Sequence, residues 1–381
     1  MLLIKQAEVY APEYQGVQDV LVCGGVIEAV EEHIDEQLPF CKVIDGRGKK
    51  LTPGLIDPHV HITGGGGEGS FHTQVPPVKF SELISGGVTS LVGLLGTDGI
   101  SRSVENLLAR AKALKEEGLS VYVCTGSYGY PSVTLTGDVK KDIMFIDEVI
   151  GVKLALSDHR APNVTVDELI RLASDTRVAG MLSGKCGMVT LHMGGDERAL
   201  SLVNKALEST SIPIKIFHPT HITRSRELME QAFDFAKRGG FIDMTCGSKG
   251  ESAPSLCAIK AKEQGVPMEN ITFSSDGMGS WSTYDEAGNL LRIGYSAVDT
   301  IYEEIKRLVL EFGMPLEQAL CFATSNTARA LEIEKHKGHI AQGMDADILL
   351  FDEDMTLNTV IAKGEVMMED HTVMRTGTYE A

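Results

Sequence analysis

Short apolar runs alternate with amphipathic stretches through the middle of the chain. The runs are rich in Val, Ile, Leu and Phe, which is typical of buried strands. The stretches between them repeat apolar residues at helical spacing, and glycines such as Gly118 and Gly239 follow their ends. The predicted strands are Leu55–Thr63, Thr89–Leu95, Ser120–Thr125, Gly151–Leu156, Met188–His192, Ile214–Phe217, Phe241–Thr245 and Ile271–Ser274. The predicted helices include Val104–Glu117, Val166–Ser174, Glu197–Glu208, Ser225–Arg238 and Ala297–Phe312.

Eight strand-then-helix units predict an α/β protein of the (β/α)₈ barrel class, assigned here to residues 52–337. A doubly wound sheet is the alternative. The two ends of the chain differ from the middle, because short strand-like pieces such as Val20–Cys23 and Asp347–Phe351 are separated there by Gly and Asp turns. Neither end is long enough to form a stable sheet alone. We therefore expect residues 1–51 and 338–381 to form one small β domain together.

The composition indicates an ordinary globular core, with 43% hydrophobic and 23% charged residues. The formal net charge of -18 disfavours nucleic acids and anionic membranes as partners, because an acidic surface repels phosphates. Any anionic substrate would need arginines of its own in the site.

Seven cysteines occur without a CxxC pair, which favours a reducing compartment over a disulfide framework. The first residues contain Lys5, Glu8 and Pro12, so we expect no signal peptide. No apolar run approaches the ~20 residues of a membrane helix. We expect a cytoplasmic protein.

Residues that can bind metal follow the predicted strands. His59 and His61 lie two apart at the end of the first strand and so project from the same face. Lys153 lies in the fourth strand, where a buried ammonium is costly without a partner. The remaining candidates end the fifth, sixth and eighth strands, and a barrel would bring all of these ends to one rim: His192, His218, His221 and Asp276.

Each of these residues has a simpler explanation when taken alone. The His-x-His pattern occurs by chance, Lys153 could form a salt bridge, and Asp276 could cap a turn. Their common placement at the ends of periodic strands favours one shared metal site.

The segment PGLIDPHVH, with Lys153 and the later ligand-type residues, resembles the amidohydrolase superfamily. The resemblance implies two metal ions bridged by a carbamylated lysine (N6-carboxylysine), which would turn the buried cation into a carboxylate. Zn²⁺ suits such nitrogen and oxygen ligands. The resemblance further implies that His59, His61 and Asp276 hold one zinc, that His192 and His221 hold the other, and that Lys153 bridges them. His218 is then a structural or supporting residue.

Further segments resemble the isoaspartyl dipeptidases within that superfamily, and this resemblance covers nearly the whole chain. They are GGGGEGS (64–70), LLGTDGISR (94–102), TGSYGYPS (125–132), KLALSDHR (153–160), PTHITR (219–224) and SSDGMGS (274–280). This second resemblance implies that Glu68 binds the substrate ammonium and that Arg160 and Arg224 bind carboxylates. It also implies that Gly66, Thr97 and Ser280 contact the substrate. It favours Tyr128 over Tyr130 as hydrogen-bond donor to the developing oxyanion, and Asp276 as the general base and acid for a metal-bridging hydroxide.

The charges of a β-aspartyl dipeptide agree with this assignment, because its one ammonium and two carboxylates need one fixed acid and two cations. Glu68 follows a glycine run that would let the backbone approach a ligand. A cyclic amidohydrolase of the dihydroorotase or hydantoinase type is the main alternative, although it would not need Glu68. A non-catalytic relative is a second alternative, which the complete set of ligand-type residues disfavours. The family resemblance also implies a homo-oligomer.

Overall fold

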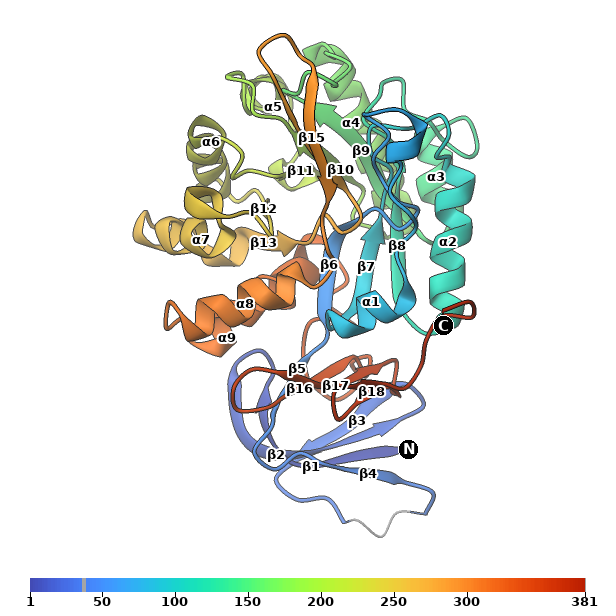
Figure 1. Cartoon of the computed structure of the whole chain (residues 1–381), viewed down its shortest axis with the longest axis vertical. Helices are drawn as coiled ribbons and strands as arrows, with labels where there is room; N and C mark the ends of the chain where they lie inside the picture. The colour runs from blue at the N-terminus through green and yellow to red at the C-terminus, as the bar shows by residue number, and fades with distance from the viewer. Residues whose placement is uncertain (36–38, 381) are drawn as a thin grey trace.

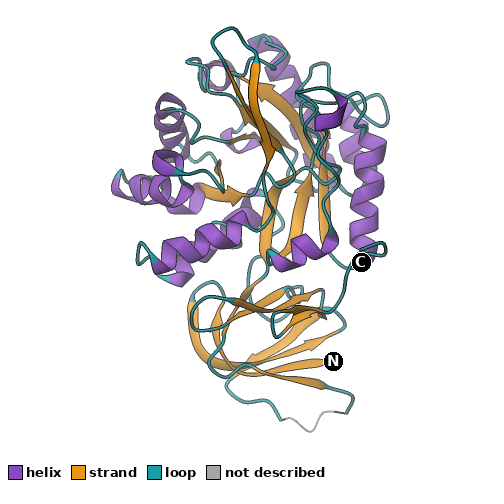
Figure 2. Cartoon of the chain, in the orientation of Figure 1, coloured by secondary structure: helices purple, strands orange, loops and turns teal. Residues whose placement is uncertain are grey.

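A curled parallel sheet forms the centre of this computed structural model, which describes residues 1–35 and 39–380 (Figures 1 and 2). One set of strands pairs in sequence order, each with the next: β6 (Leu55–Val60), β7 (Val88–Gly93), β8 (Ser120–Gly126), β9 (Val149–Leu156), β10 (Met188–Met193) and β11 (Phe217–Thr220). β12 (Ile242–Thr245) pairs in parallel with β13 (Ile271–Ser274). β12 also contacts β11, and β13 contacts β6, so the two sheets follow one curved path.

Helices lie outside these strands (Figure 2). They are α1 (Phe80–Ser85), α2 (Val104–Glu117), α3 (Val139–Phe145), α4 (Val166–Ser183), α5 (Ser201–Ser209), α6 (Arg226–Lys237), α7 (Pro254–Glu263), α8 (Thr300–Leu310), α9 (Leu316–Cys321) and α10 (Ser325–Ala330). The Ser103 side chain accepts a hydrogen bond from the Asn106 backbone at the start of α2, and Gly118 ends that helix at φ 117°. Within the described residues, no helix is long and apolar enough to cross a membrane.

The predicted strands correspond to β6–β13, with one clear shift at the sixth. We expected that strand at Ile214–Phe217, but Ile214–Ile216 form a 3₁₀ turn after Pro213, and β11 begins at Phe217. A short apolar run does not distinguish a turn from a strand by periodicity alone. Helix α4 also extends beyond the expected Ser174 to Ser183, because its apolar face continues through the buried Ala179 and Gly180.

Strands from both ends of the chain share a mixed sheet. The early strands are β1 (Leu2–Tyr10), β2 (Tyr14–Cys23), β3 (Val26–Glu31), β4 (Lys42–Asp45) and β5 (Lys50–Pro53). The late strands are β16 (Ile348–Phe351), β17 (Leu357–Ala362), β18 (Glu365–Glu369) and β19 (Thr372–Val373). β5 lies between β1 and β16, so the two groups join there. Figure 1 shows the blue and red strands side by side below the parallel sheet.

A buried ion-pair cluster lies where the mixed sheet meets the parallel strands. Lys337 is only 4% exposed, and its Nζ donates to Ser120 Oγ at 2.7 Å. The same ammonium pairs with Asp345 at 2.7 Å and with Asp347. Asp347 precedes β16 and Ser120 begins β8, so Lys337 links the two parts of the fold.

An antiparallel hairpin follows β13. It consists of β14 (Ser280–Tyr284) and β15 (Leu290–Tyr295), and Figure 1 shows it extending along the front of the parallel strands. The His159 ring packs edge-on against the Tyr284 ring with centroids 4.8 Å apart. The hairpin therefore contacts the segment that follows β9.

Candidate metal and substrate site

The end of β6 is tied to the segment that follows β13. The carboxylate of Asp57 accepts hydrogen bonds from the His59 backbone at 3.1 Å and from the Ser275 backbone at 3.2 Å, and a short one from the Ser275 hydroxyl. Burial raises the pKa of Asp57 to about 7. The His61 backbone donates to Gly277 O at 2.8 Å. These bonds bring both histidines of the His-x-His pair beside Asp276.

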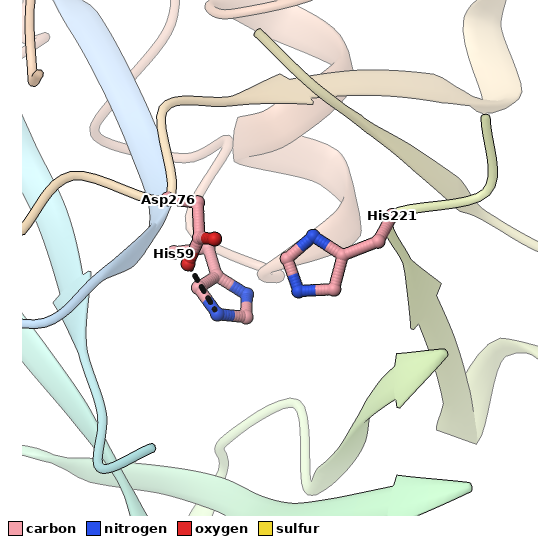
Figure 3. Close-up of side chains that lie close together, drawn as sticks. All are labelled: His59, His221 and Asp276. Atoms are coloured by element: carbon pink, nitrogen blue, oxygen red, sulfur yellow. Dashed lines mark ion pairs between the residues drawn. The ribbon is translucent and has the colours of Figure 1, made fainter. Parts of the chain in front are cut away.

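His59, His221 and Asp276 form a compact group whose possible ligand atoms all lie within 4.8 Å of one another. Figure 3 shows the three side chains converging from separate elements. Oδ1 of Asp276 lies 3.4 Å from His59 Nε2 and 3.1 Å from His61 Nε2. His221 and Asp276 both adopt left-handed backbone conformations, with φ 62° and 51°. Non-glycine residues adopt this region at a cost, which is commonly tolerated at functional sites.

Several buried nitrogens in this group have no hydrogen-bond partner among the described residues. They include His221 Nε2, while His221 Nδ1 lies 2.5 Å from the Thr245 hydroxyl. Buried polar atoms are normally paired, so an unpaired imidazole nitrogen beside a carboxylate is suited to bind a cation. Histidine and aspartate are ligand types that Zn²⁺ accepts. The residues of this site therefore fit the metal that the sequence predicts.

Lys153 lies in β9 and is completely buried beside the histidines. Its Nζ lies 2.8 Å from His59 Nε2, and among the described residues it forms no ion pair with a carboxylate. The simpler explanation of a salt bridge therefore does not hold. Burial lowers the pKa of Lys153 to about 7, so much of this amine is neutral near neutral pH.

His192 stands beside the group, but both of its ring nitrogens are already engaged. Its ring centroid is 4.6 Å from that of His221. Nδ1 lies 2.6 Å from the Tyr128 hydroxyl, and Nε2 lies 3.1 Å from Asp158 Oδ2 and 2.8 Å from Arg224 Nη1. Burial and the Arg224 charge lower the pKa of His192 well below its ordinary value. The structure thus places His192 at the site without joining it to the three-residue group.

Glu68 is the centre of a second polar cluster. Its Oε1 accepts from Thr97 Oγ1 at 3.2 Å, from Ser280 Oγ at 2.8 Å and from Arg160 Nη1 at 3.2 Å. Its Oε2 is buried without a partner among the described residues. This free acceptor is a suitable position for a ligand ammonium. The structure therefore brings these predicted substrate residues together.

Gly66 has a conformation that requires glycine. Its φ is 84°, and a Cβ atom there would lie 2.5 Å from Thr73 O. Gly66, Glu68 and Thr97 line a cavity of about 330 Å³, and Phe71 and Ile100 also line it. This cavity offers room for a small ligand beside the Glu68 carboxylate.

Arg224, a predicted substrate residue, donates from Nη1 to Met193 O at 3.0 Å.

The remaining predicted residues are His218 and two tyrosines. His218 bonds through Nε2 to Lys215 O at 3.0 Å, which agrees with a structural role. Tyr128 is buried, and burial raises the pKa of its hydroxyl, so the phenol stays protonated as a donor. Tyr130 is only half-buried and packs against the core.

Asp158 is a site residue that the sequence analysis did not single out. It is 7% exposed and accepts from Arg160 Nε at 2.9 Å and Nη2 at 2.9 Å, in addition to its contact with His192. Burial opposes its ionisation, but hydrogen bonds from His192 and Arg160 hold the pKa of Asp158 well below its ordinary range. The Asp-x-Arg spacing could have suggested the pair, but it also occurs at Asp45–Arg47 and Asp196–Arg198, so spacing alone does not mark Asp158.

Residues 51–377 match the amidohydrolase family. A β-aspartyl dipeptidase from Fervidobacterium islandicum AW-1, solved in complex with the β-Asp-Leu dipeptide, is 44% identical to this chain. The similarity covers 100% of both chains with a TM-score of 0.94. N-acetylglucosamine-6-phosphate deacetylase from Pasteurella multocida shares the fold at 18% identity, with a TM-score of 0.65 over 97% of this chain and 100% of its own.

More distant relatives catalyse other reactions. Imidazolonepropionase from Colwellia psychrerythraea is 22% identical over 84% of this chain and 80% of its own length. Adenine deaminase from Bacillus subtilis is 24% identical over 96% of this chain but only 56% of its own length. This chain therefore spans little more than half of that deaminase.

Proposed function

Because this chain belongs to the amidohydrolase family, we propose that it is a zinc-dependent dipeptidase that hydrolyses the isopeptide bond of β-aspartyl dipeptides. The full-length similarity to an enzyme solved with β-Asp-Leu carries this proposal. The Glu68 cluster and the group of possible metal ligands agree with it.

The proposal includes the architecture that holds the site. We propose that β6–β13 close into a (β/α)₈ barrel over residues 52–337, supported by the contacts of β13 with β6 and of β11 with β12. Residues 1–51 and 338–381 would form the small β domain, supported by their shared sheet. Active sites of such barrels lie at the carboxyl ends of the strands.

Two zinc ions would be held by His59, His61 and Asp276 on one side and by His192 and His221 on the other, with carbamylated Lys153 between them. Bound there, zinc would supply an acidified water and a Lewis acid for the scissile carbonyl. The unpartnered nitrogen of His221 supports this assignment. The buried Lys153 amine supports carbamylation, since a neutral amine adds to CO₂ through its nitrogen and releases one proton, which leaves a negatively charged carbamate in place of a cation.

The charged side chains around the cavity would position the dipeptide. Glu68 would take the substrate ammonium on its free Oε2. Arg160 and Arg224 would each take a carboxylate, because a guanidinium matches carboxylate geometry. Gly66, Thr97 and Ser280 would complete the contacts around Glu68.

Asp276 and Tyr128 would carry the chemistry supplied by the chain itself. Asp276 would accept the proton of the attacking water and pass it to the leaving nitrogen, which departs poorly unless protonated. Tyr128 would donate its hydroxyl hydrogen to the carbonyl oxygen as negative charge develops there. Its buried, protonated phenol supports this role.

The seven cysteines are free, which agrees with a reducing compartment, and we propose that the protein is cytoplasmic. We also propose that it forms a homo-oligomer. Light scattering after size exclusion would measure the oligomeric state. A cyclic amidohydrolase remains the alternative activity, since such enzymes share the fold.

A substrate panel assayed with the zinc-loaded protein tests the function. We expect hydrolysis of β-Asp-Leu and almost none of α-Asp-Leu, because Glu68, Arg160 and Arg224 fix where the substrate charges lie. Dihydroorotate and hydantoin serve as cyclic comparison substrates. Equal rates on the two aspartyl isomers, or faster opening of a cyclic substrate, would contradict the proposal.

A further inference from the structure

One carboxylate touches residues of both halves of the proposed site. Asp158 Oδ1 accepts from Arg160 Nε, and Oδ2 accepts from Arg160 Nη2, each at 2.9 Å. Oδ2 also lies 3.1 Å from His192 Nε2. Arg160 belongs to the proposed carboxylate-binding residues, and His192 belongs to the proposed zinc ligands. The buried Asp158 side chain thus contacts one proposed substrate-binding residue and one proposed metal ligand.

Hydrogen-bond accounting decides what His192 shares with Asp158. Nε2 faces both Asp158 Oδ2 and Arg224 Nη1. It can form a hydrogen bond with only one of them, because the carboxylate needs Nε2 to donate a hydrogen and the guanidinium needs it to accept one. If Nε2 accepted from Arg224, Nδ1 would carry the hydrogen, and the Tyr128 hydroxyl hydrogen would have no acceptor among the described residues. If Nε2 donates to Asp158, Tyr128 donates to Nδ1.

The second arrangement gives an acceptor to both the Tyr128 hydroxyl and the His192 Nε2–H. Arg224 then gives its hydrogen to Met193 O at 3.0 Å. The Nδ1 lone pair of His192 then points away from Asp158 and accepts the Tyr128 hydrogen, a position that a bound metal would take instead. A carboxylate that accepts one ring hydrogen of histidine fixes the tautomer and orientation in which the other nitrogen can bind a metal.

The backbone holds Asp158 rigidly in this position. Ser157 has φ 53°, its hydroxyl donates to Ala199 O at 2.8 Å, and its carbonyl accepts from the Asp196 backbone at 3.1 Å. A Cβ atom on Gly194 would lie 2.1 Å from Ser157 O, so glycine is needed for the close approach of the two segments. The position of Asp158 is therefore set by its own segment, and its carboxylate can orient the side chains of His192 and Arg160.

We propose that Asp158 is a positioning residue that sets the tautomer of the metal ligand His192 and the orientation of the substrate-binding Arg160 at once. The inference rests on the proposed function, because it assigns those two residues their roles. Arg160 then presents its remaining Nη1 edge toward Glu68, which it contacts at 3.2 Å. Loss of Asp158 should impair zinc binding and substrate binding together.

The chain offers a matched control for this pair. Asp158 also accepts from the Arg160 backbone N at 2.9 Å. Asp45 accepts from Arg47 through the same three bonds, from the backbone N at 3.1 Å, Nε at 2.9 Å and Nη2 at 2.6 Å. Asp45 ends β4 in the mixed sheet, where its side chain is 58% exposed. The local Asp-x-Arg geometry is therefore common to both pairs, and only Asp158 touches the proposed site.

The experiment compares Asp158→Asn, Arg160→Met and Asp45→Asn with the unaltered protein. Asparagine keeps the shape of aspartate but places an amide donor against Arg160 Nη2 and His192 Nε2. Zinc affinity is measured by competition with a colorimetric chelator. The KM for β-Asp-Leu is measured at saturating zinc and does not depend on the folded fraction of the preparation. Asp158→Ala, which adds no donor, is measured in parallel in case the asparagine variant does not fold.

We expect both Asp158 variants to bind zinc roughly 10–100-fold more weakly and to raise the KM by roughly tenfold or more. Arg160→Met should raise the KM with wild-type zinc affinity, and Asp45→Asn should change neither. A zinc affinity or a KM that stays at the wild-type value in the Asp158 variants would overturn the inference. Failure of the unaltered protein to cleave β-Asp-Leu would contradict the proposed function instead.

Discussion

Nε2 of His61 lies 3.1 Å from Oδ1 of Asp276, although 215 positions separate the two residues in the chain. His59 Nε2 approaches the same oxygen at 3.4 Å. One carboxylate oxygen thus faces both histidines of the His-x-His pair, and this contact brings the two ends of the parallel sheet together at the proposed site.

The first prediction concerns that carboxylate. Asp276→Asn should have a lower kcat than Tyr128→Phe or Arg224→Met, because it removes a proposed ligand and the proposed proton carrier together. Steady-state kinetics and zinc analysis of the same preparation check this. A kcat above that of Tyr128→Phe would contradict the double role.

Lys153→Ala should lose zinc and activity, since an alanine cannot be carbamylated. Short-chain carboxylic acids added to the variant should restore part of both by occupying the vacated position. Zinc per chain, measured by elemental analysis, checks this. Lys140→Ala, at a half-exposed lysine paired with Asp175, is the control and should keep full zinc. Full zinc and activity in Lys153→Ala would contradict the bridging role.

Tyr128→Phe should lower kcat by roughly 10²–10³-fold with zinc retained, because the lost hydrogen bond strengthens only as the oxyanion forms. Tyr130→Phe provides the comparison, since Tyr130 is the alternative donor from the same segment. A wild-type kcat in the zinc-bound Tyr128→Phe variant would mean that Tyr130 or the metal, and not Tyr128, stabilises the oxyanion.

Arg224→Met should mainly weaken binding of the charged dipeptide. A hydrogen bond to a charged group contributes about 1.5–3 kcal/mol, so kcat/KM should fall by one to two decades or more while zinc stays bound. Kinetics with β-Asp-Leu check this. An unchanged kcat/KM would place Arg224 outside the substrate contacts.

Lys337→Met should destabilise the fold, because it leaves the buried Asp347 without its cation. Breaking a buried ion pair costs about 3–5 kcal/mol, whereas Lys112→Met, at a half-exposed lysine beside Glu148, should cost about 1 kcal/mol or less. Urea unfolding of both variants measures the difference in the free energy of unfolding.

The pH dependence of that difference has a definite sign. Burial opposes the charge of Lys337, but Asp347 and Asp345 raise its pKa above the ordinary lysine value. A raised pKa contributes stability that is complete below the unfolded-state pKa, about 10.4, and is lost as pH rises through the folded-state pKa. The difference between wild type and Lys337→Met should therefore be constant from about pH 6 to 9. A decline within that window would contradict the ion-pair explanation.

The sequence predicted the strands of the parallel sheet well, because each carries a local apolar run with a helix after it. The sequence also led us to expect that the ligand-type residues lie close together, because strand ends meet at one rim, and His59, His221 and Asp276 do so. Their role as metal ligands stays a prediction. It missed the turn at Ile214–Ile216, where periodicity does not separate a turn from a strand. It missed Asp158, because its partner His192 lies in another strand, Arg224 lies after β11, and only folding brings them into contact.

The position of β5 between β1 and β16 has a consequence for synthesis on the ribosome. Lys50 of β5 pairs with Glu8 of β1 on one side and with Phe351 of β16 on the other. The β16 side of β5 thus stays open until the segment around Phe351 has been translated and has emerged from the exit tunnel. Throughout that interval the nascent chain carries an unpaired strand edge, which is a point where other chains can add. Premature termination before β16 should therefore yield an aggregation-prone fragment, and chaperone capture of stalled chains should peak before that point.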